Sequence, residues 1–130
     1  GLAFSPDEKI LYVVESRATP HRKIWAYDVG ADGALANRRV FVDAQGPGAY
    51  DGIRVDVSGH VWCGFGSSTG AQAEQLDGVR VYAPDGKPVA QIHLPERCAN
   101  LCFGGAKNNR LFMAASHSVY ALYVNTTGAV

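Results

Sequence analysis

The fold class follows from one stretch of the chain, Ile53-Arg-Val-Asp-Val-Ser-Gly-His-Val-Trp-Cys-Gly64. It contains a short strand, a polar turn around Ser58 and Gly59, and a second apolar strand. In the first strand, apolar side chains at positions 53, 55 and 57 alternate with polar ones at 54, 56 and 58. Because side chains on a strand point to opposite faces in turn, the stretch predicts a β-hairpin with one buried face.

The same pattern occurs twice more along the chain, beginning at Leu2 and at Leu101. The three copies lie about fifty residues apart, within the range of a propeller repeat. Further segments rich in β-branched and aromatic residues follow the hairpins. Those expected as third strands are Ile24–Val29, Val79–Tyr82 and Val119–Val124, and those expected as fourth strands are Arg39–Asp43 and Val89–Leu94.

Four antiparallel strands in each repeat predict the blades of a β-propeller. No segment has a sustained helical period, so the whole chain is expected to be all-β. We expect residues 1–130 to form a partial β-propeller domain with blades near 1–46, 47–97 and 98–130, the last lacking its closing strand. The chain opens within a strand and without an initiator methionine, so we expect the N-terminal half of the propeller to be missing.

The composition narrows the classes of partner. The 130 residues are 47% hydrophobic and carry no formal net charge, so there is no basic field to attract nucleic acid. The apolar runs are too short to span a membrane. The three cysteines, Cys63, Cys98 and Cys102, lack the paired spacing of a zinc site, and we expect buried free thiols. Cytoplasmic and periplasmic locations both remain open.

Asp51 is the first candidate for a functional residue. Asp-Gly pairs occur four times, at 32–33, 51–52, 77–78 and 85–86. Three of these pairs lie where a turn is expected, and Asp-Gly is ordinary turn chemistry. Asp51 instead opens an inner strand, and the inner strands of a propeller line its central channel. Asp51 is therefore expected at a channel mouth.

Two further residues are weaker candidates for the same mouth. Asn100 occupies the equivalent position ahead of the third hairpin, although a turn residue that satisfies nearby backbone groups is the alternative. Glu15 ends a second strand and could approach as a supporting residue. The four histidines, His21, His60, His93 and His117, have no ligand-like spacing and are expected to be structural or solvent-exposed.

Three motifs resemble the gluconolactonase/regucalcin/luciferin-regenerating enzyme-like family. The run Tyr50-Asp-Gly-Ile-Arg-Val-Asp-Val-Ser-Gly-His-Val-Trp-Cys-Gly64 resembles its P-D-G-hydrophobic-x-x-D-x-x-G-x-hydrophobic-W signature, with Tyr50 in place of the usual proline. Residues 1–13 resemble its N-G-L-x-x-S-x-D motif, and residues 101–122 resemble its last blade. The resemblance covers nearly the whole chain and implies the C-terminal portion of a six-bladed, bacterial-type gluconolactonase.

The resemblance also implies a chemistry for Asp51. Members of the family use a divalent cation to hydrolyse sugar lactones, as in the conversion of D-glucono-1,5-lactone to gluconate. Asp51 matches a metal ligand and catalytic residue, and whether it acts as base, ligand or both stays open. Ca²⁺ is the first expectation for the metal, with Mg²⁺, Mn²⁺ and Zn²⁺ as alternatives.

The family's other ligands and substrate contacts fall outside this chain. We therefore expect the isolated chain to be inactive, and its partners to be a sugar lactone and the remaining N-terminal blades. Two alternatives to this lactonase remain: a non-catalytic calcium-binding propeller scaffold, and an esterase or lactonase with a different substrate range. The fold alone does not choose among them.

Overall fold

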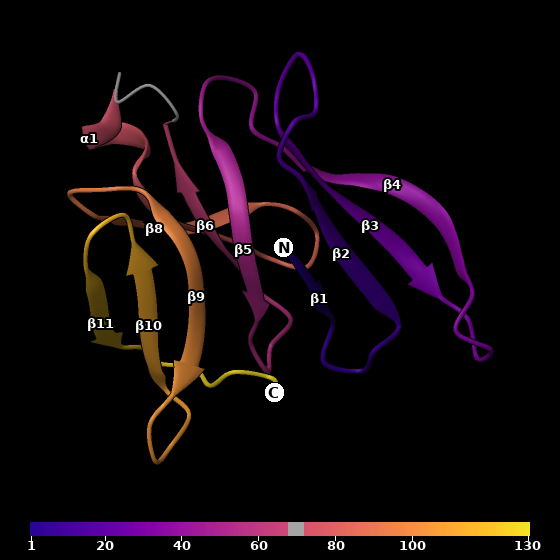
Figure 1. Cartoon of the computed structure of the whole chain (residues 1–130). Helices are drawn as coiled ribbons and strands as arrows, with labels where there is room; N and C mark the ends of the chain where they lie inside the picture. The colour runs from indigo at the N-terminus through magenta and orange to yellow at the C-terminus, as the bar shows by residue number, and fades with distance from the viewer. Residues whose placement is uncertain (68–71) are drawn as a thin grey trace.

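The computed structural model describes residues 1–67 and 72–130, and it confirms the expected all-β class (Figure 1). The described strands form three antiparallel sheets, and the one described helix is a single turn, α1 (Ala73–Leu76). The first sheet contains β1 (Leu2–Phe4), β2 (Ile10–Glu15), β3 (Lys23–Val29) and β4 (Leu35–Asp43) in that order. The second contains β5 (Ala49–Val55), β6 (Val61–Gly66), β7 (Gly78–Tyr82) and β8 (Pro88–His93) in order. The third contains β9 (Cys98–Gly104), β10 (Arg110–Ala115) and β11 (Val119–Tyr123).

Two Asp-Gly pairs form the hairpin turns that their sequence predicts. Asp32 accepts a hydrogen bond from the backbone N–H of Ala34 at 3.0 Å, and Gly33 has a φ of 81°. Asp85 accepts the equivalent bond from Lys87 at 3.0 Å, and Gly86 has a φ of 85°. A carboxylate that satisfies the turn backbone and a glycine in the left-handed region are what such turns require.

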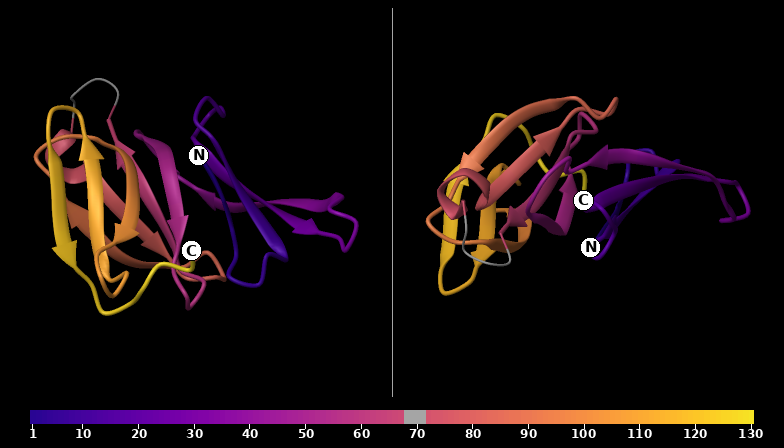
Figure 2. Two further views of the ribbon diagram at one scale, coloured as in Figure 1. Left: turned by 60° about the horizontal axis from the view of Figure 1, so that its bottom comes forward. Right: turned by 90° about the horizontal axis from the view of Figure 1, so that it is seen from above.

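The three sheets are arranged around their first strands. Strands β1, β5 and β9 lie side by side, while β4, β8 and β11 lie at the far edges of their sheets (Figures 1 and 2). At Gly64 a Cβ atom would lie 2.6 Å from the carbonyl oxygen of Cys98, so the glycine lets the second and third sheets approach closely. All three first strands begin on the face that is uppermost in Figure 1.

Two apolar layers hold the sheets together, one on each side of the middle sheet. The layer between the first and second sheets includes Tyr12, Ile24, Tyr50, Ile53 and Phe65. The layer between the second and third sheets includes Trp62, Val79, Val81, Leu101, Leu111 and Met113. Because both faces of the middle sheet are covered, every residue of β6 is buried. This explains why Val61–Gly66 is apolar without alternation.

The predicted alternation after Ile53 is wrong at its end. Asp56 was expected on the polar face, yet its side chain is 1% exposed, and Val57 is 54% exposed. Strand β5 ends at Val55, and Asp56 accepts hydrogen bonds from the backbone N–H groups of Ser58 and His60 and from the Trp62 indole at 3.0 Å. The carboxylate thus folds back to organise the turn, which is how an aspartate competes with strand structure.

The expectation of buried thiols holds for Cys63 and Cys98 but is wrong for Cys102, which is exposed on β9. All three are free cysteines. Among the described residues no helix is long and apolar enough to cross a membrane.

Candidate functional site

Asp51 lies inside β5, whereas the sequence predicted it at the very start of the strand. The pairing of β5 with β6 is irregular at this point. Tyr50 pairs with Phe65 and Ile53 pairs with Cys63, so Asp51 and Gly52 together oppose Gly64 alone. Such a bulge bends the strand and redirects a side chain. The Asp51 side chain is exposed, and its carboxylate has no hydrogen bond or ion pair with any described residue. The bulge therefore presents a carboxylate that is unbonded to the described residues.

Asn100 is also inside its strand, β9, next to a second irregularity where the pairing with β10 shifts between Ala114 and Ala115. Its side-chain oxygen accepts a hydrogen bond from the backbone N–H of Leu101 at 2.9 Å. A Cβ atom on Gly52 would lie 2.2 Å from that oxygen and 2.8 Å from the Asn100 Cα. The structure therefore brings Asn100 against the residue next to Asp51, and its bond to the Leu101 N–H is the backbone contact expected of the alternative, a turn-type residue.

Two further observations show that the chain is closely packed around Asp51 and Asn100. A Cβ atom on Gly1 would lie 2.4 Å from the carbonyl oxygen of Asp51. Burial raises the pKa of the Cys98 thiol to about 11, and the nearby Asp51 carboxylate adds to the rise. The starts of β1, β5 and β9 thus meet around Asp51 and Asn100.

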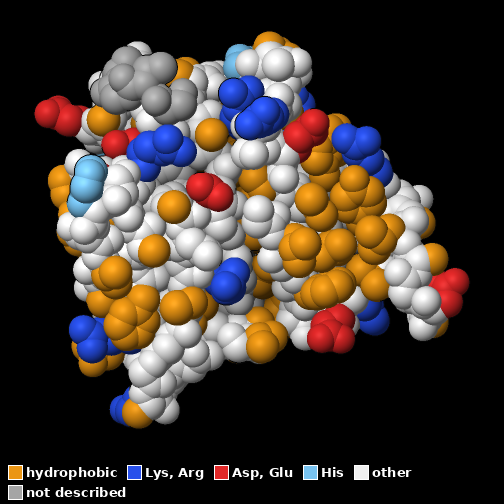
Figure 3. All heavy atoms as spheres, viewed as in Figure 1, with side chains coloured by type: hydrophobic (Ala, Val, Ile, Leu, Met, Phe, Trp, Pro, Cys, Tyr) orange, Lys and Arg blue, Asp and Glu red, His pale blue; other side chains and the backbone are white. Residues whose placement is uncertain are grey.

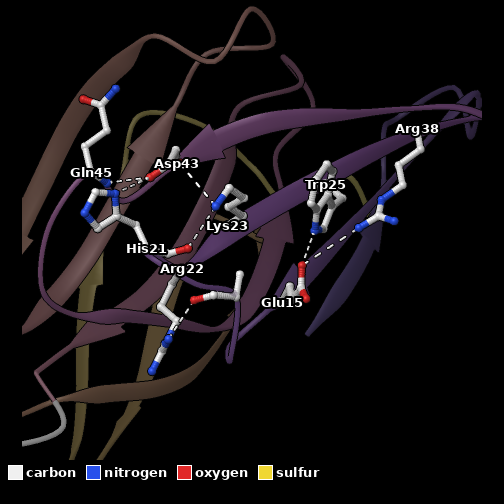
Figure 4. Close-up of polar contacts among 9 residues, drawn as sticks. Glu15, His21, Arg22, Lys23, Trp25, Arg38, Asp43 and Gln45 are labelled. Atoms are coloured by element: carbon white, nitrogen blue, oxygen red, sulfur yellow. Dashed lines mark hydrogen bonds and ion pairs between the residues drawn. The ribbon is translucent and has the colours of Figure 1, made fainter.

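Glu15 has a different environment from the one predicted for a residue at this mouth. Its carboxylate accepts a hydrogen bond from the Trp25 indole at 2.6 Å and lies 4.0 Å from the Arg38 guanidinium. Arg38 in turn stacks over the Trp25 ring, 3.8 Å from its centroid. Figure 4 shows all three side chains on one surface of the first sheet, with Glu15 directed at Trp25 and Arg38. These contacts give Glu15 a role in its own sheet.

A pocket of about 590 Å³ adjoins Asp51. Its border includes the β2–β3 loop with Arg17, His21 and Arg22, the 46–50 segment, and Arg97 ahead of β9. Figure 3 shows basic side chains gathered on this part of the surface. A larger cavity of about 710 Å³, between β4 and the β7–β8 pair, does not include Asp51.

No motif in the sequence marks these arginines. Isolated basic residues on three loops carry no periodic signal, and only the folded arrangement places them around one pocket. The four histidines carried no prediction of function. Three of them contact a carboxylate: His21 lies 3.4 Å from Asp43, His60 3.3 Å from Asp56 and His117 3.2 Å from Glu96.

The donor atoms near Asp51 fit part of a metal site. A carboxylate and an amide oxygen are hard donors of the type that Ca²⁺ and Mg²⁺ prefer. Within 1–67 and 72–130, however, no group of three or more histidine, cysteine, aspartate or glutamate side chains is placed to hold a metal. These residues can therefore contribute only some of the ligands of a cation.

Comparison with known proteins identifies the family of the chain. Residues 1–117 match the model of the SMP-30/Gluconolactonase/LRE-like region. The chain is 34% identical to a gluconolactonase of Zymomonas mobilis over 98% of its own length and 35% of that protein. It is 32% identical to a 6-deoxy-6-sulfogluconolactonase of Pseudomonas putida, over 89% of the chain and 37% of the relative. The chain thus spans just over a third of the length of these curated relatives.

Solved structures show the same similarity. A gluconolactonase from Xanthomonas campestris superposes with a TM-score of 0.75 at 35% identity, covering 95% of this chain and 36% of that one. A calcium-binding protein, regucalcin, from Agrobacterium tumefaciens superposes with a TM-score of 0.80 at 22% identity, covering 98% and 46%. At that identity the second match concerns the fold alone. With the family match over most of its residues, the chain belongs to the SMP-30/gluconolactonase/LRE-like family.

Proposed function

We propose that the full-length protein is a metal-dependent hydrolase of sugar lactones, with D-glucono-1,5-lactone as a substrate and gluconate as the product. The chain described above would form the C-terminal blades of a six-bladed propeller. The observation that carries the proposal is the β5 bulge, which presents the exposed Asp51 carboxylate beside Asn100 where three strands begin. The names of the gluconolactonase relatives support the same reaction.

Asp51 has two roles in this proposal. A bound divalent cation would polarise the lactone carbonyl and stabilise negative charge on its oxygen. The Asp51 carboxylate supplies an oxygen ligand, and as a free acceptor it can also orient the attacking water or take its proton. Asn100 offers an amide N–H donor for a substrate hydroxyl while its oxygen stays bonded to the Leu101 N–H.

Ca²⁺ is the first choice for the cation because the donors are hard oxygens and the regucalcin neighbour is described as calcium-binding. Mg²⁺, Mn²⁺ and Zn²⁺ are alternatives. Among the described residues no group of three or more His, Cys, Asp or Glu side chains is placed to hold the cation, so the remaining ligands would come from the rest of the propeller. For this reason the 130 residues alone are expected to be inactive.

The test is proton release from glucono-1,5-lactone by the full-length protein. Asp51→Ala should lower the metal-dependent rate at least about a hundredfold, since removing a catalytic base or a metal ligand has effects of that order. Asp32→Ala is the matched control, because Asp32 is also an exposed aspartate before glycine but lies in a hairpin turn remote from the pocket. EDTA should abolish the activity, and added Ca²⁺ should restore it.

Asp51→Asn separates the two roles. Asparagine keeps an oxygen for coordination but cannot take a proton. If Asp51 is the base, this variant should retain cation affinity, measured calorimetrically, and lose turnover; if Asp51 is mainly a ligand, both should fall. Full metal-dependent activity in Asp51→Ala would contradict the proposal.

A second candidate function is a non-catalytic calcium-binding scaffold, favoured by the regucalcin neighbour alone. It predicts calcium binding that depends on Asp51 with no turnover of any lactone. An esterase of different range would instead hydrolyse aryl esters faster than lactones.

A further inference from the structure

Three arginines surround the pocket next to Asp51, two from the β2–β3 loop and one from the segment between β8 and β9. In the loop, Arg17 is exposed and Arg22 is half-buried just before β3, and Arg97 is exposed ahead of β9. Asp51 is the single acidic residue on the described border of the pocket. The border therefore carries a clear excess of positive charge.

The guanidinium groups form no ion pair with the described part of the chain. Among residues 1–67 and 72–130, no carboxylate lies within ion-pair distance of Arg17, Arg22 or Arg97. Arg22 donates a hydrogen bond of 2.7 Å to the backbone carbonyl of Ala18, which fixes its direction without cancelling its charge. In Figure 4 its guanidinium points away from the cluster formed by His21, Lys23 and Asp43.

The neighbouring acidic groups are already occupied. Asp43 lies 3.4 Å from His21 and 3.5 Å from Lys23. Glu96 accepts hydrogen bonds from the Tyr120 hydroxyl at 2.9 Å and from the backbone of His117. Asp77 is buried and accepts the backbone N–H of Ser67 at 2.9 Å. None of these carboxylates supplies a counter-charge to the arginines.

Arg97 is also positioned by packing. A Cβ atom on Gly66 would lie 2.5 Å from the Arg97 Cγ, so the aliphatic stem of the arginine rests on the bare backbone of β6. A stem held in this way loses less side-chain freedom when its guanidinium binds a ligand. The pocket thus combines two positioned guanidinium groups, those of Arg22 and Arg97, with the exposed one of Arg17.

We propose that this pocket binds an anionic substituent of the substrate, so that the preferred substrates are sugar lactones carrying a phosphate, sulfonate or carboxylate group. The proposal rests on the lactonase function proposed above and specifies its substrate class. Guanidinium groups form charge-assisted, often bidentate, hydrogen bonds with such oxyanions. Their combined field also raises the local concentration of anions at low ionic strength.

The experiment compares two lactones that share a ring and a reaction: glucono-1,5-lactone and its 6-phosphate, with the full-length protein. We expect kcat/KM for the phosphorylated lactone to exceed that for the neutral lactone about tenfold at low salt, and the ratio to shrink toward one at 0.5 M NaCl. Arg97→Gln and Arg22→Gln should each lower this ratio several-fold, mainly through KM. Lys107→Gln, an equal charge change on the exposed β9–β10 turn, should leave the ratio unchanged.

A binding measurement keeps the inference independent of turnover. Calorimetry with 6-phosphogluconate and with gluconate should show tighter, Arg97-dependent binding of the phosphorylated acid. The same measurement with a sulfonate analogue tests whether an oxyanion other than phosphate is sufficient for tight binding. Equal kcat/KM for both lactones, or a ratio insensitive to all three arginines, would overturn the anionic class and leave the lactonase proposal intact. Hydrolysis of neither lactone, with binding of neither acid, would overturn both.

Discussion

At the scale of single residues, Gly52 matters because it has no side chain. A methyl group there would overlap the Asn100 side chain and approach its Cα to 2.8 Å, so β5 and β9 can meet beside Asp51 only over a bare backbone. We expect Gly52→Ala to destabilise the full-length protein by about 1–3 kcal/mol, the usual cost of overpacking. It should also lower lactonase activity by displacing Asn100 from Asp51.

Urea unfolding and proton-release assays on the same preparations test this prediction. Gly46→Ala is the control for the stability measurement alone, because Gly46 borders the pocket but a Cβ atom there would find its nearest neighbour, the carbonyl oxygen of Ala44, only at 4.0 Å. A Gly52→Ala protein as stable and active as the parent would show that the close approach has no consequence.

The cysteines allow a second test at the residue scale. Burial raises the pKa of the Cys98 thiol to about 11, so about a thousandth of it is ionised at pH 8. Burial also raises the pKa of Cys63, whereas Cys102 is exposed. Because the thiolate is the reactive form, iodoacetamide at pH 8 should modify Cys102 rapidly and spare the other two.

Mass spectrometry of the labelled, digested protein gives the measurement. Raising the pH from 8 to 10 should increase the labelling rate of Cys98 about tenfold per pH unit, because the ionised fraction of its thiol rises in that proportion below a pKa of about 11. Complete labelling in urea serves as the control. Rapid modification of Cys63 at pH 8 in the native protein would mean that the two sheets do not pack as described.

At the scale of elements, the strands were predictable because each carries its own signal. Segments such as Ile24–Val29 and Val79–Tyr82 are rich in β-branched and aromatic residues. The Asp-Gly pairs at 32–33 and 85–86 mark the turns that join these segments to the strands that follow them. The periodicity of a strand and the chemistry of a two-residue turn are both local, so one sequence is sufficient to predict them.

The bulge in β5 was not predictable in the same way. It exists because Asp51 and Gly52 share one partner, Gly64, and that register depends on pairs on both sides of it. The turn at Asp56 depends on the Trp62 indole, and the pocket arginines are brought together by loops from separate sheets. The sequence therefore indicated that Asp51 and Asn100 occupy equivalent positions near the starts of two inner strands, but not the strand geometry that exposes Asp51 or the charge around it.

At the scale of the whole molecule, the three sheets differ in how well they are covered. The middle sheet packs on both faces, whereas the first packs on one. The register places Leu2 opposite Val13 and Phe4 opposite Leu11 on the uncovered face, and Figure 3 shows hydrophobic side chains gathered over this sheet. Leu2 is 61% and Phe4 45% exposed. We propose that another blade of the full-length propeller covers this face.

The 130 residues expressed alone should therefore self-associate, since an uncovered apolar sheet face of this kind favours contact between copies. Light scattering as a function of concentration measures the effect. Leu2→Lys combined with Phe4→Lys should reduce association, because contact between two copies would then bury the positive charges of the new lysines. Val57→Lys, at a residue 54% exposed in the β5–β6 turn, should not reduce it. A monomer at all concentrations would mean that this face needs no neighbouring blade.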